Sequence, residues 1–396
     1  MRAFILLLLL SSYCLASFGY SRVTIERIWT IETDGSTYDF TGALAVNNSQ
    51  QKVVSITTSP AMDIRQDKNG TIWVHRQASG EGTAALHATA IVDIYYDTNI
   101  TSDPPLPTGE EDTTELTEFN QAMSSQAVSL AREDSSLDTI ANLVNWVHSY
   151  VDYDLTYWGK IKSAREVFNE RKGVCVEYTH LLLSLVRSLG FDARYVNGYV
   201  LANAWQPHAW AEIYLPGYGW LPADATFGQV GTLDNTHLAI NYGMDQASAF
   251  DVLVTQDADA RISVREKVRA NFLSKDEQGV SVKMDYDSQN RVVGVELENK
   301  RPEYAIGSYS FLISDVYGTS NSSVIVLDPM QTTHRYYPVN ASLFSNGLSG
   351  VPASASFNDA EDQLQITPLG TGGGTDNGSI CAPALLIGLL LWLKLF

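Results

Sequence analysis

The sequence is poor in cysteine, with only Cys14, Cys175 and Cys381 among 396 residues. Cys14 and Cys381 lie in apolar segments near the two ends, so a single cysteine remains in the body of the chain. This pattern excludes a disulfide framework, and no C-x-x-C or paired Cys/His spacing suited to structural zinc is present. Cys175 is therefore available either for packing or for chemistry.

Basic residues are also scarce, since 26 Lys and Arg stand against 45 Asp and Glu and give a formal net charge of −19. A nucleic-acid partner requires a basic face that displaces counterions, so we expect none. Basic peptides or bound cations suit this charge better. A hydrophobic content of 45% is ample for packed cores, and the length suits two or three domains.

Both ends of the chain have the composition of targeting segments. Arg2 precedes an apolar run over residues 4–10, and small residues follow it, which predicts a signal peptide over residues 1–19. A Gly/Thr/Ser-rich stalk over 367–379 leads into a hydrophobic segment over 380–396, whose apolar run is shorter than the ~20 residues of a typical membrane span. We expect an exported cell-surface protein that is anchored to a membrane at its carboxyl end.

The chain between these ends divides into parts of different periodicity. Near the amino end, alternating β-branched and aromatic runs, separated by Asp-Gly, Asn-Gly and Ser-Gly turns, indicate an all-β module. In the middle of the chain, a segment with helical periodicity is followed by further strand-like runs. There is no internal repeat of fixed period. The predicted parts are a β domain over 20–102, an exposed acidic, Pro-rich linker over 103–115, a core over 116–255 and a β-sandwich over 256–366.

Cys175 is expected at the start of a helix. Apolar residues then recur at steps of three and four, and Gly190 is suited to a left-handed stop. The first turn of a helix offers unpaired N–H groups and the positive end of the dipole, which favour a thiolate. An earlier helix is predicted after Ser135, with Asp138 in its capping turn.

Two further residues give this cysteine a possible chemistry. His208 precedes a strand-like run, and Asp224 ends the next run after a turn near Gly217, so the two are expected to face each other across a hairpin. A thiolate, an imidazole that moves the proton and a carboxylate that orients the imidazole are the groups of covalent acyl transfer. Cys175, His208 and Asp224 are the predicted catalytic residues.

Each of these residues also has an ordinary structural interpretation. A lone cysteine in an apolar helix is more often inert core, and His208 and Asp224 taken singly are a strand histidine and a turn residue. His180 is expected to be structural, and Glu177 to be a first-turn partner of the helix dipole. Three tryptophans are expected to form cleft walls or core: Trp205, Trp210 and Trp220. The acidic residues Glu110 to Asp112, Asp257 and Asp259 are expected to lie in solvated loops and not to bind calcium.

The stretches RKGVCVEYTHLLLSLVRSLGFDARYVNGY and HAWAEIYLPGYGWLPADATFG resemble the core of the transglutaminase-like superfamily over about residues 135–230. The resemblance implies an α+β fold with a papain-like core, in which a helix bundle packs on an antiparallel sheet, here flanked by all-β, immunoglobulin-like modules. It also implies that Cys175 is the nucleophile, His208 the general base and acid, and Asp224 the orienting carboxylate. The Cys175 N–H is one expected oxyanion donor, and Tyr157 or Trp158 is a candidate for the second, although Trp158 is equally suited to buried packing.

The carboxyl end resembles the tripartite surface signals of some archaeal proteins, in which Cys-Gly-Pro opens an apolar run and a basic cluster ends it. This chain departs from the pattern, with Cys381-Ala382-Pro383 at the opening and Lys394 alone at the end. Lipidation of Cys381 and processing of the tail therefore stay open.

Two enzymatic functions and one binding function are consistent with these residues. Attack of Cys175 on an amide of a protein or peptide gives a thioester, which water resolves in a peptidase or amidase and an amine resolves in a crosslinking enzyme. Such chemistry requires no cofactor or metal, and the resemblance favours hydrolysis slightly. The alternative is a noncatalytic surface protein that uses the same scaffold for binding.

Overall fold

The computed structural model describes residues 19–95, 99–202, 204–275, 279–313, 320–340 and 350–367. The predicted signal peptide lies almost wholly outside these ranges, as do the hydrophobic tail, Cys14 and Cys381. None of the helices within the ranges is long and apolar enough to span a bilayer. Export and anchoring therefore stay predictions.

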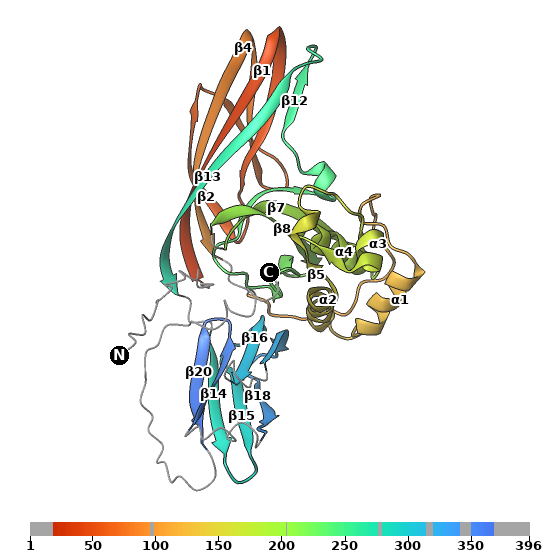
Figure 1. The fold of residues 1–396 in the computed structure, drawn as a ribbon, viewed down its shortest axis with the longest axis vertical. Coiled ribbons are helices and arrows are strands. Elements are labelled where there is room, and N and C mark those ends of the chain that lie inside the picture. Colours follow the sequence, from red (N-terminus) through yellow and green to blue (C-terminus); the bar gives the residue numbers. More distant parts are fainter. Residues whose placement is uncertain are drawn as a thin grey trace, which may run out of the picture.

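The amino-terminal module is one open antiparallel sheet of very long strands (Figure 1). Strand β1 (Gly19–Val46) pairs with β4 (Thr71–Tyr95) over almost its whole length. The module is thus not an immunoglobulin-like sandwich in the part of the chain that is described. Its other strands are β2 (Gln51–Ser59), β3 (Asp63–Gln66), β12 (Val252–Thr255) and β13 (Arg261–Lys275).

Two strands of this sheet come from much later in the sequence than we expected. Strand β13 lies in the segment over 256–366 that was assigned to the carboxyl-terminal sandwich, but it pairs with the first half of β1. Strand β12 lies in the predicted core over 116–255, but it pairs with residues 38–41 of β1. The assignment was wrong because alternation identifies a strand and does not identify the sheet that it joins. The expected Asp-Gly and Ser-Gly turns were also wrong, because Asp34-Gly35 lies inside β1 and Ser79-Gly80 lies inside β4.

The core consists of helices packed on an antiparallel sheet of order β10-β9-β8-β7-β11, as expected for the fold class (Figure 1). The predicted linker over 103–115 is tied to this core, because the Asp103 carboxylate accepts hydrogen bonds at the start of α2. The helices are α1 (Gln121–Leu130), α2 (Ser136–Tyr150), α3 (Ala164–Glu170) and α4 (Cys175–Arg187). The strands are β5 (Asp152–Tyr153), β6 (Lys172–Gly173), β7 (Ala193–Leu201), β8 (Trp205–Leu215), β9 (Gly219–Asp224), β10 (Gln229–Val230) and β11 (Leu238–Gly243), and short 3-10 helices span Leu155–Tyr157 and Gln246–Ser248.

The core sheet is buried on both faces. Ala209, Ala211 and Ile213 on β8 pack in the cluster that contains the helices, whereas Trp210 packs with residues of β1 and β4. This alternation has the period of two that a strand imposes on its side chains. The amino-terminal sheet and the helices therefore enclose the strands that carry His208 and Asp224.

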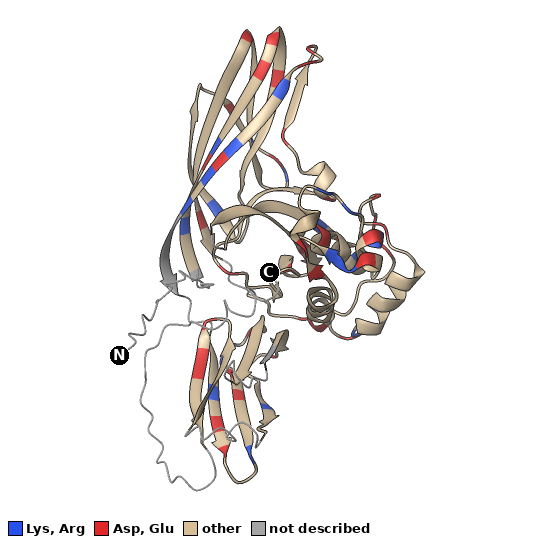
Figure 2. Ribbon diagram, in the orientation of Figure 1, with Lys and Arg blue, Asp and Glu red and all other residues tan. Residues whose placement is uncertain are grey.

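The carboxyl-terminal module packs two sheets face to face, of orders β14-β15-β18 and β17-β16-β19-β20. It is a β-sandwich, and its immunoglobulin-like character stays a prediction. Figure 2 shows Asp and Glu spread over both β modules and the helical layer, with Lys and Arg interleaved along β13. The strands are β14 (Val280–Asp287), β15 (Val292–Asn299), β16 (Ala305–Ile313), β17 (Ser320–Leu327), β18 (Thr332–Pro338), β19 (Val351–Phe357) and β20 (Ala360–Ile366).

Candidate active site

Cys175 is the first residue of α4, where the sequence placed it. Its sulfur is a free thiol, and the residue is only 4% exposed. The apolar positions that predicted the helix are buried against the other helices and the sheet, and Gly190 adopts the expected left-handed conformation with φ of +88°. The helix is therefore fixed by its buried face, and its amino end presents the cysteine.

The start of α4 is held by the carboxylate of Glu177. Its Oε2 accepts the N–H of Val174 at 2.9 Å, and its Oε1 accepts the N–H of Lys162 at 3.3 Å. Burial raises the pKa of Glu177, and the backbone N–H groups partly oppose that rise. A Cβ added at Gly173 would lie 2.2 Å from Glu177 Cβ, so glycine is required where the chain passes this side chain.

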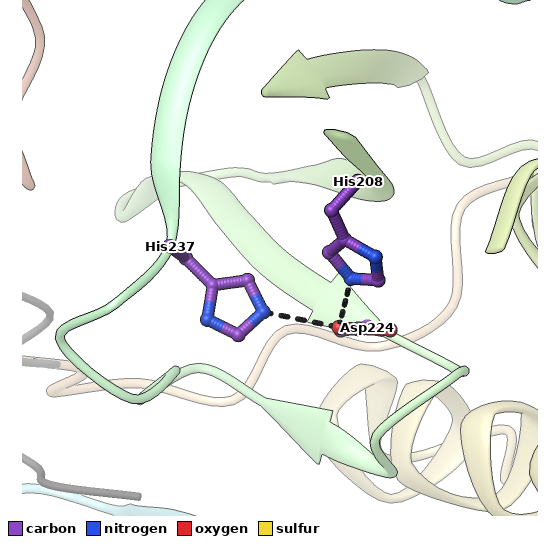
Figure 3. Close-up of side chains that lie close together, drawn as sticks. All are labelled: His208, Asp224 and His237. Atoms are coloured by element: carbon purple, nitrogen blue, oxygen red, sulfur yellow. Dashed lines mark hydrogen bonds and ion pairs between the residues drawn. The ribbon is translucent and has the colours of Figure 1, made fainter. Parts of the chain in front are cut away.

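His208 and Asp224 meet on neighbouring strands. The Nε2 of His208 lies 2.8 Å from Oδ2 of Asp224, and both side chains are buried (Figure 3). The register pairs Ala211 with Ala223, so its continuation places Asp224 opposite Trp210 and two residues away from His208. The two predicted residues therefore interact diagonally across the hairpin and do not face each other directly.

The carboxylate of Asp224 is satisfied on all sides. Its Oδ1 accepts the N–H groups of Thr226 at 2.7 Å and Phe227 at 3.2 Å. Its Oδ2 faces the Nε2 atoms of His208 and His237, the latter at 3.1 Å (Figure 3). Four partners match the roughly four lone-pair positions of an ionised carboxylate, so Asp224 is fixed in one orientation.

The charges of these groups are strongly coupled. Burial by itself would lower the pKa of His208, but the Asp224 carboxylate and hydrogen bonds with Asp224 and Cys175 raise that pKa to about 10. Burial acts to raise the pKa of Asp224, yet the two imidazoles hold it well below its usual range. The site therefore favours an ionised carboxylate beside a protonated imidazole.

The same interactions connect Cys175 with His208. The hydrogen bond and charge of Cys175 are among the influences that raise the pKa of His208. Because Nε2 of His208 is committed to Asp224, Nδ1 is the ring nitrogen left for proton exchange with the thiol. His208 and Asp224 thus form one buried pair, and Cys175 is buried at the start of α4, among the groups that act on the pKa of His208.

His237 and Asp234 belong to this group and were not anticipated. His237 lies on the loop before β11, and its Nδ1 is 3.2 Å from Oδ1 of Asp234. Burial opposes protonation of His237, but the charge of Asp234 and hydrogen bonds with Asp224 and Asp234 raise its pKa to about 9. Sequence patterns could not identify these residues, because the segment Asp234-Asn235-Thr236-His237 has the composition of an ordinary turn.

His208, Asp224 and His237 also form the one group in the described ranges whose ligand atoms are close enough to share a metal ion, all within 4.8 Å of one another. The observed contacts have the lengths of hydrogen bonds between nitrogen donors and a carboxylate. Hydrogen bonding accounts for the full arrangement, and we assign the residues to it. The acidic loops at residues 110–112 and 257–259 form no such group.

The two candidates for the second oxyanion donor do not lie as expected. The Tyr157 hydroxyl donates to Oε2 of Glu170 at 2.7 Å, which engages it at the surface. Trp158 is 55% exposed, so the buried packing considered for it was wrong. Tyr153 was missed, although it is half-buried, pairs with Gly173, and has its pKa raised by burial and then by the charges of Cys175 and Asp224.

The remaining singled-out residues have structural partners. His180 is fully buried, and its Nδ1 lies 2.9 Å from the carbonyl oxygen of Lys162, in agreement with a structural role. Trp210 is buried in the core, while the Arg194 guanidinium lies over the Trp220 ring, with its Cζ 4.0 Å from the ring centroid. Trp205 is partly buried against the same cluster as Trp210.

The core of the chain is similar in sequence to known proteins. The family model of the transglutaminase-like superfamily matches residues 121–225. A protein-glutamine gamma-glutamyltransferase of Pseudomonas aeruginosa is 32% identical over 103 residues, which is 23% of this chain and 14% of that protein. An uncharacterized protein of Mycobacterium leprae is 25% identical over 114 residues, which is 26% of this chain and 41% of that protein. The chain thus spans less than half the length of either relative.

Matches among solved structures include a candidate cysteine protease of Cytophaga hutchinsonii, at 21% identity and a TM-score of 0.46, which covers 65% of this chain and 92% of that one. Red sea bream transglutaminase matches at 7% identity and a TM-score of 0.22 over 87% of this chain and 78% of its own. Residues 121–225 of this protein form a transglutaminase-like domain.

Proposed function

We propose that the protein is a thiol-dependent enzyme that cleaves or transfers the acyl group of a protein or peptide amide through Cys175, His208 and Asp224. The observation that carries the proposal is the buried series of Asp224, His208 and Cys175, in which His208 bonds Asp224 at 2.8 Å and Cys175 is among the groups that raise the pKa of His208. The match of residues 121–225 to the transglutaminase-like family supports the same chemistry. The roles of the three residues follow from their positions in the series.

The first half of the reaction forms a thioester. The thiolate of Cys175 attacks the amide carbon, and the His208 imidazolium gives its Nδ1 proton to the amine as the carbon–nitrogen bond breaks. Asp224 holds Nε2 and stabilises the charged ring. The N–H of Cys175, in the first turn of α4, has no acceptor within the helix and serves as an oxyanion donor, with the Tyr153 hydroxyl as a candidate second donor.

The second half of the reaction regenerates the enzyme. Neutral His208 removes a proton from the acceptor, the acceptor attacks the thioester carbon, and Cys175 leaves as the thiolate. We favour water as the acceptor, which makes the protein a peptidase or amidase. An amine acceptor remains the second candidate, because a relative of the matched domain is a protein-glutamine gamma-glutamyltransferase.

The proposal extends to the setting of the enzyme. We infer that it acts at the cell surface, exported by the segment over 1–19 and held at a membrane by residues 380–396. Its substrates would then be extracellular proteins or peptides. Expression of the full chain, followed by cell fractionation and protease shaving of intact cells, tests this location, and recovery of the protein only in the soluble interior would contradict it.

The reaction is tested by incubating the protein with a glutamine-containing protein, with and without a primary amine, and measuring product masses. Chain cleavage identifies a peptidase, a one-unit mass gain identifies deamidation, and amine incorporation identifies transfer. Cys175→Ser is the matched control, since it keeps a hydroxyl in place of the thiol. Equal product formation by wild type and Cys175→Ser would contradict the proposal, and an inert Cys175 would favour the binding alternative.

A further inference from the structure

Asp224 is shared between two histidines, and the second one has no part in the chemistry proposed above. The Nε2 of His237 lies 3.1 Å from Oδ2 of Asp224, the oxygen that His208 also contacts (Figure 3). Both side chains are fully buried. Removing a histidine side chain from water costs free energy that its hydrogen bonds must offset. The presence of His237 at this position therefore requires an explanation.

The contacts of His237 define its protonation state. Its Nε2 faces a carboxylate oxygen that already accepts from His208, and its Nδ1 faces Oδ1 of Asp234 at 3.2 Å and the Asp234 carbonyl oxygen at 3.2 Å. Each of these three partner atoms can only accept a hydrogen bond when the two carboxylates are ionised. A neutral imidazole carries one N–H and one bare nitrogen, so only the imidazolium satisfies both sides.

Asp234 is itself held in place. Its Oδ2 accepts from Nε2 of Gln229 at 3.1 Å, and its Oδ1 accepts from the N–H of Thr236 at 3.0 Å and from the Thr236 hydroxyl. Asp234 is therefore oriented before it meets His237, and it supplies a second negative charge on the far side of the ring. This charge compensates for burial of the cation.

We propose that His237 is a positioning residue that stays an imidazolium between Asp234 and Asp224, and that it fixes the Asp224 carboxylate and limits the basicity which Asp224 confers on His208. The proposal rests on the proposed function of Cys175 and His208. The charged and titratable groups around this unit include Asp224 from β9, His208 from β8 and Asp234 from the preceding loop. Cys175 from α4 acts on His208, and Tyr153 from β5 lies within reach of the charges of Asp224 and Cys175. The Trp210 and Phe227 rings beside His237 are uncharged.

The cation has a definite effect on the reaction. The ring centroids of His237 and His208 are 5.5 Å apart, so the positive charge of His237 opposes the proton on His208. His208 then releases its proton to the leaving amine more readily than it would beside Asp224 alone. Loss of His237 removes this opposition, and both limbs of the pH–rate profile move to higher pH, by about one unit or more at an effective dielectric near 20.

The test compares full-length wild type with His237→Gln, Asp234→Asn and the double variant, using the pH profile of Cys175 alkylation by iodoacetamide and peptide mapping of the label. His237→Gln shifts the profile upward. Asp234→Asn shifts it in the same direction, and the double variant matches His237→Gln alone because Asp234 acts through His237. Additive shifts, or no shift in His237→Gln, would overturn the proposal.

His180→Gln is the matched control, because His180 is equally buried but pairs with backbone groups and not with a carboxylate. It is expected to lower stability without moving the profile, which is the result that a merely structural His237 would also give. If the His237 variants fail to fold, ¹⁵N spectra of the wild-type histidine rings decide the question. Two protonated nitrogens on His237 at neutral pH support the proposal, and one bare nitrogen overturns it whether or not Cys175 proves reactive.

Discussion

At the scale of single residues, the site is defined by how its charges are paired. Asp224 accepts two backbone N–H groups on one oxygen and contacts two imidazoles with the other, and the carboxylate and both imidazoles are buried. In such surroundings an unpaired charge costs several kcal/mol, so each member depends on the others. Removal of one member is therefore expected to affect both stability and chemistry.

The paired charges predict a pH dependence of stability. The pKa of His208 is raised from 6.5 to about 10 and that of His237 to about 9, so the folded chain binds more protons than the unfolded chain between these limits. The free energy of unfolding should then fall as pH rises from 7 to 9, by up to about 1.4 kcal/mol per pH unit for each histidine. Urea denaturation at the two pH values measures this change.

The control for this experiment is His208→Gln, in which the decline between pH 7 and 9 should be smaller. On the acid side the sign reverses, because the lowered pKa of Asp224 contributes stability that is lost as pH falls below its ordinary value of 3.8. A free energy of unfolding that is unchanged or higher at pH 9 than at pH 7 would show that the histidines are not held as cations.

At the scale of elements, the entry of the chain into α4 decides where the thiol lies. Gly173 passes so close to Glu177 that a methyl group would contact the Glu177 Cβ at 2.2 Å. Gly173→Ala should therefore displace the carboxylate that caps α4, destabilise the protein by about 1–3 kcal/mol, and slow the labelling of Cys175. Thermal unfolding and alkylation rates measure the two effects.

Gly80→Ala is the matched substitution, since a Cβ at Gly80 meets no heavy atom within 4 Å. Its effect on stability should stay within about 0.5 kcal/mol, and labelling should be unchanged. Equal behaviour of the two variants would mean that the passage beside Glu177 does not position Cys175.

The sequence predicted the helices and strands of the core better than it predicted which strands pair with each other. Helical spacing identified α4 and its stop at Gly190, and alternation identified β7, β8 and β9, because these patterns are local. The pairing of β13 with β1 spans more than 200 residues of sequence and leaves no local signal. The position of His237 was unpredictable for the same reason, since a loop brings it to Asp224.

At the scale of the whole molecule, the core sheet depends on the amino-terminal sheet. Trp210, Leu238 and Ile240 are buried together with residues of β1 and β4. Deletion of residues 20–95 would expose this face, and we expect the shortened protein to be insoluble or unfolded. Domains that were distinguished by composition therefore share one hydrophobic core on this side.

The carboxyl-terminal sandwich has a smaller role in the core. Its contacts with the core include Val324, whose backbone bonds the Asn145 side chain on α2, and Ser308, which donates to the carbonyl oxygen of Gly228 in the turn before β10 at 2.8 Å. A chain that ends at residue 275 should remain folded and reactive at Cys175, with a lower melting temperature. Soluble yield, melting temperature and the rate of Cys175 labelling are measured for the protein that lacks residues 20–95 and for the chain that ends at residue 275. The expectations are contradicted if the first protein is the more soluble, stable and reactive of the two.

The central claim is that His208 activates Cys175, and the most direct measurement is the rate of Cys175 alkylation between pH 5 and 9 in wild type and His208→Ala. Peptide mapping separates Cys175 from Cys14 and Cys381. With the imidazole present, labelling should persist into the acid range, whereas in His208→Ala it should rise about tenfold per pH unit toward the ordinary thiol range near 8.5. At pH 5 we expect wild type to react at least about ten times faster, after allowing for the lower intrinsic nucleophilicity of a stabilised thiolate. Superimposable profiles for the two proteins would contradict the account.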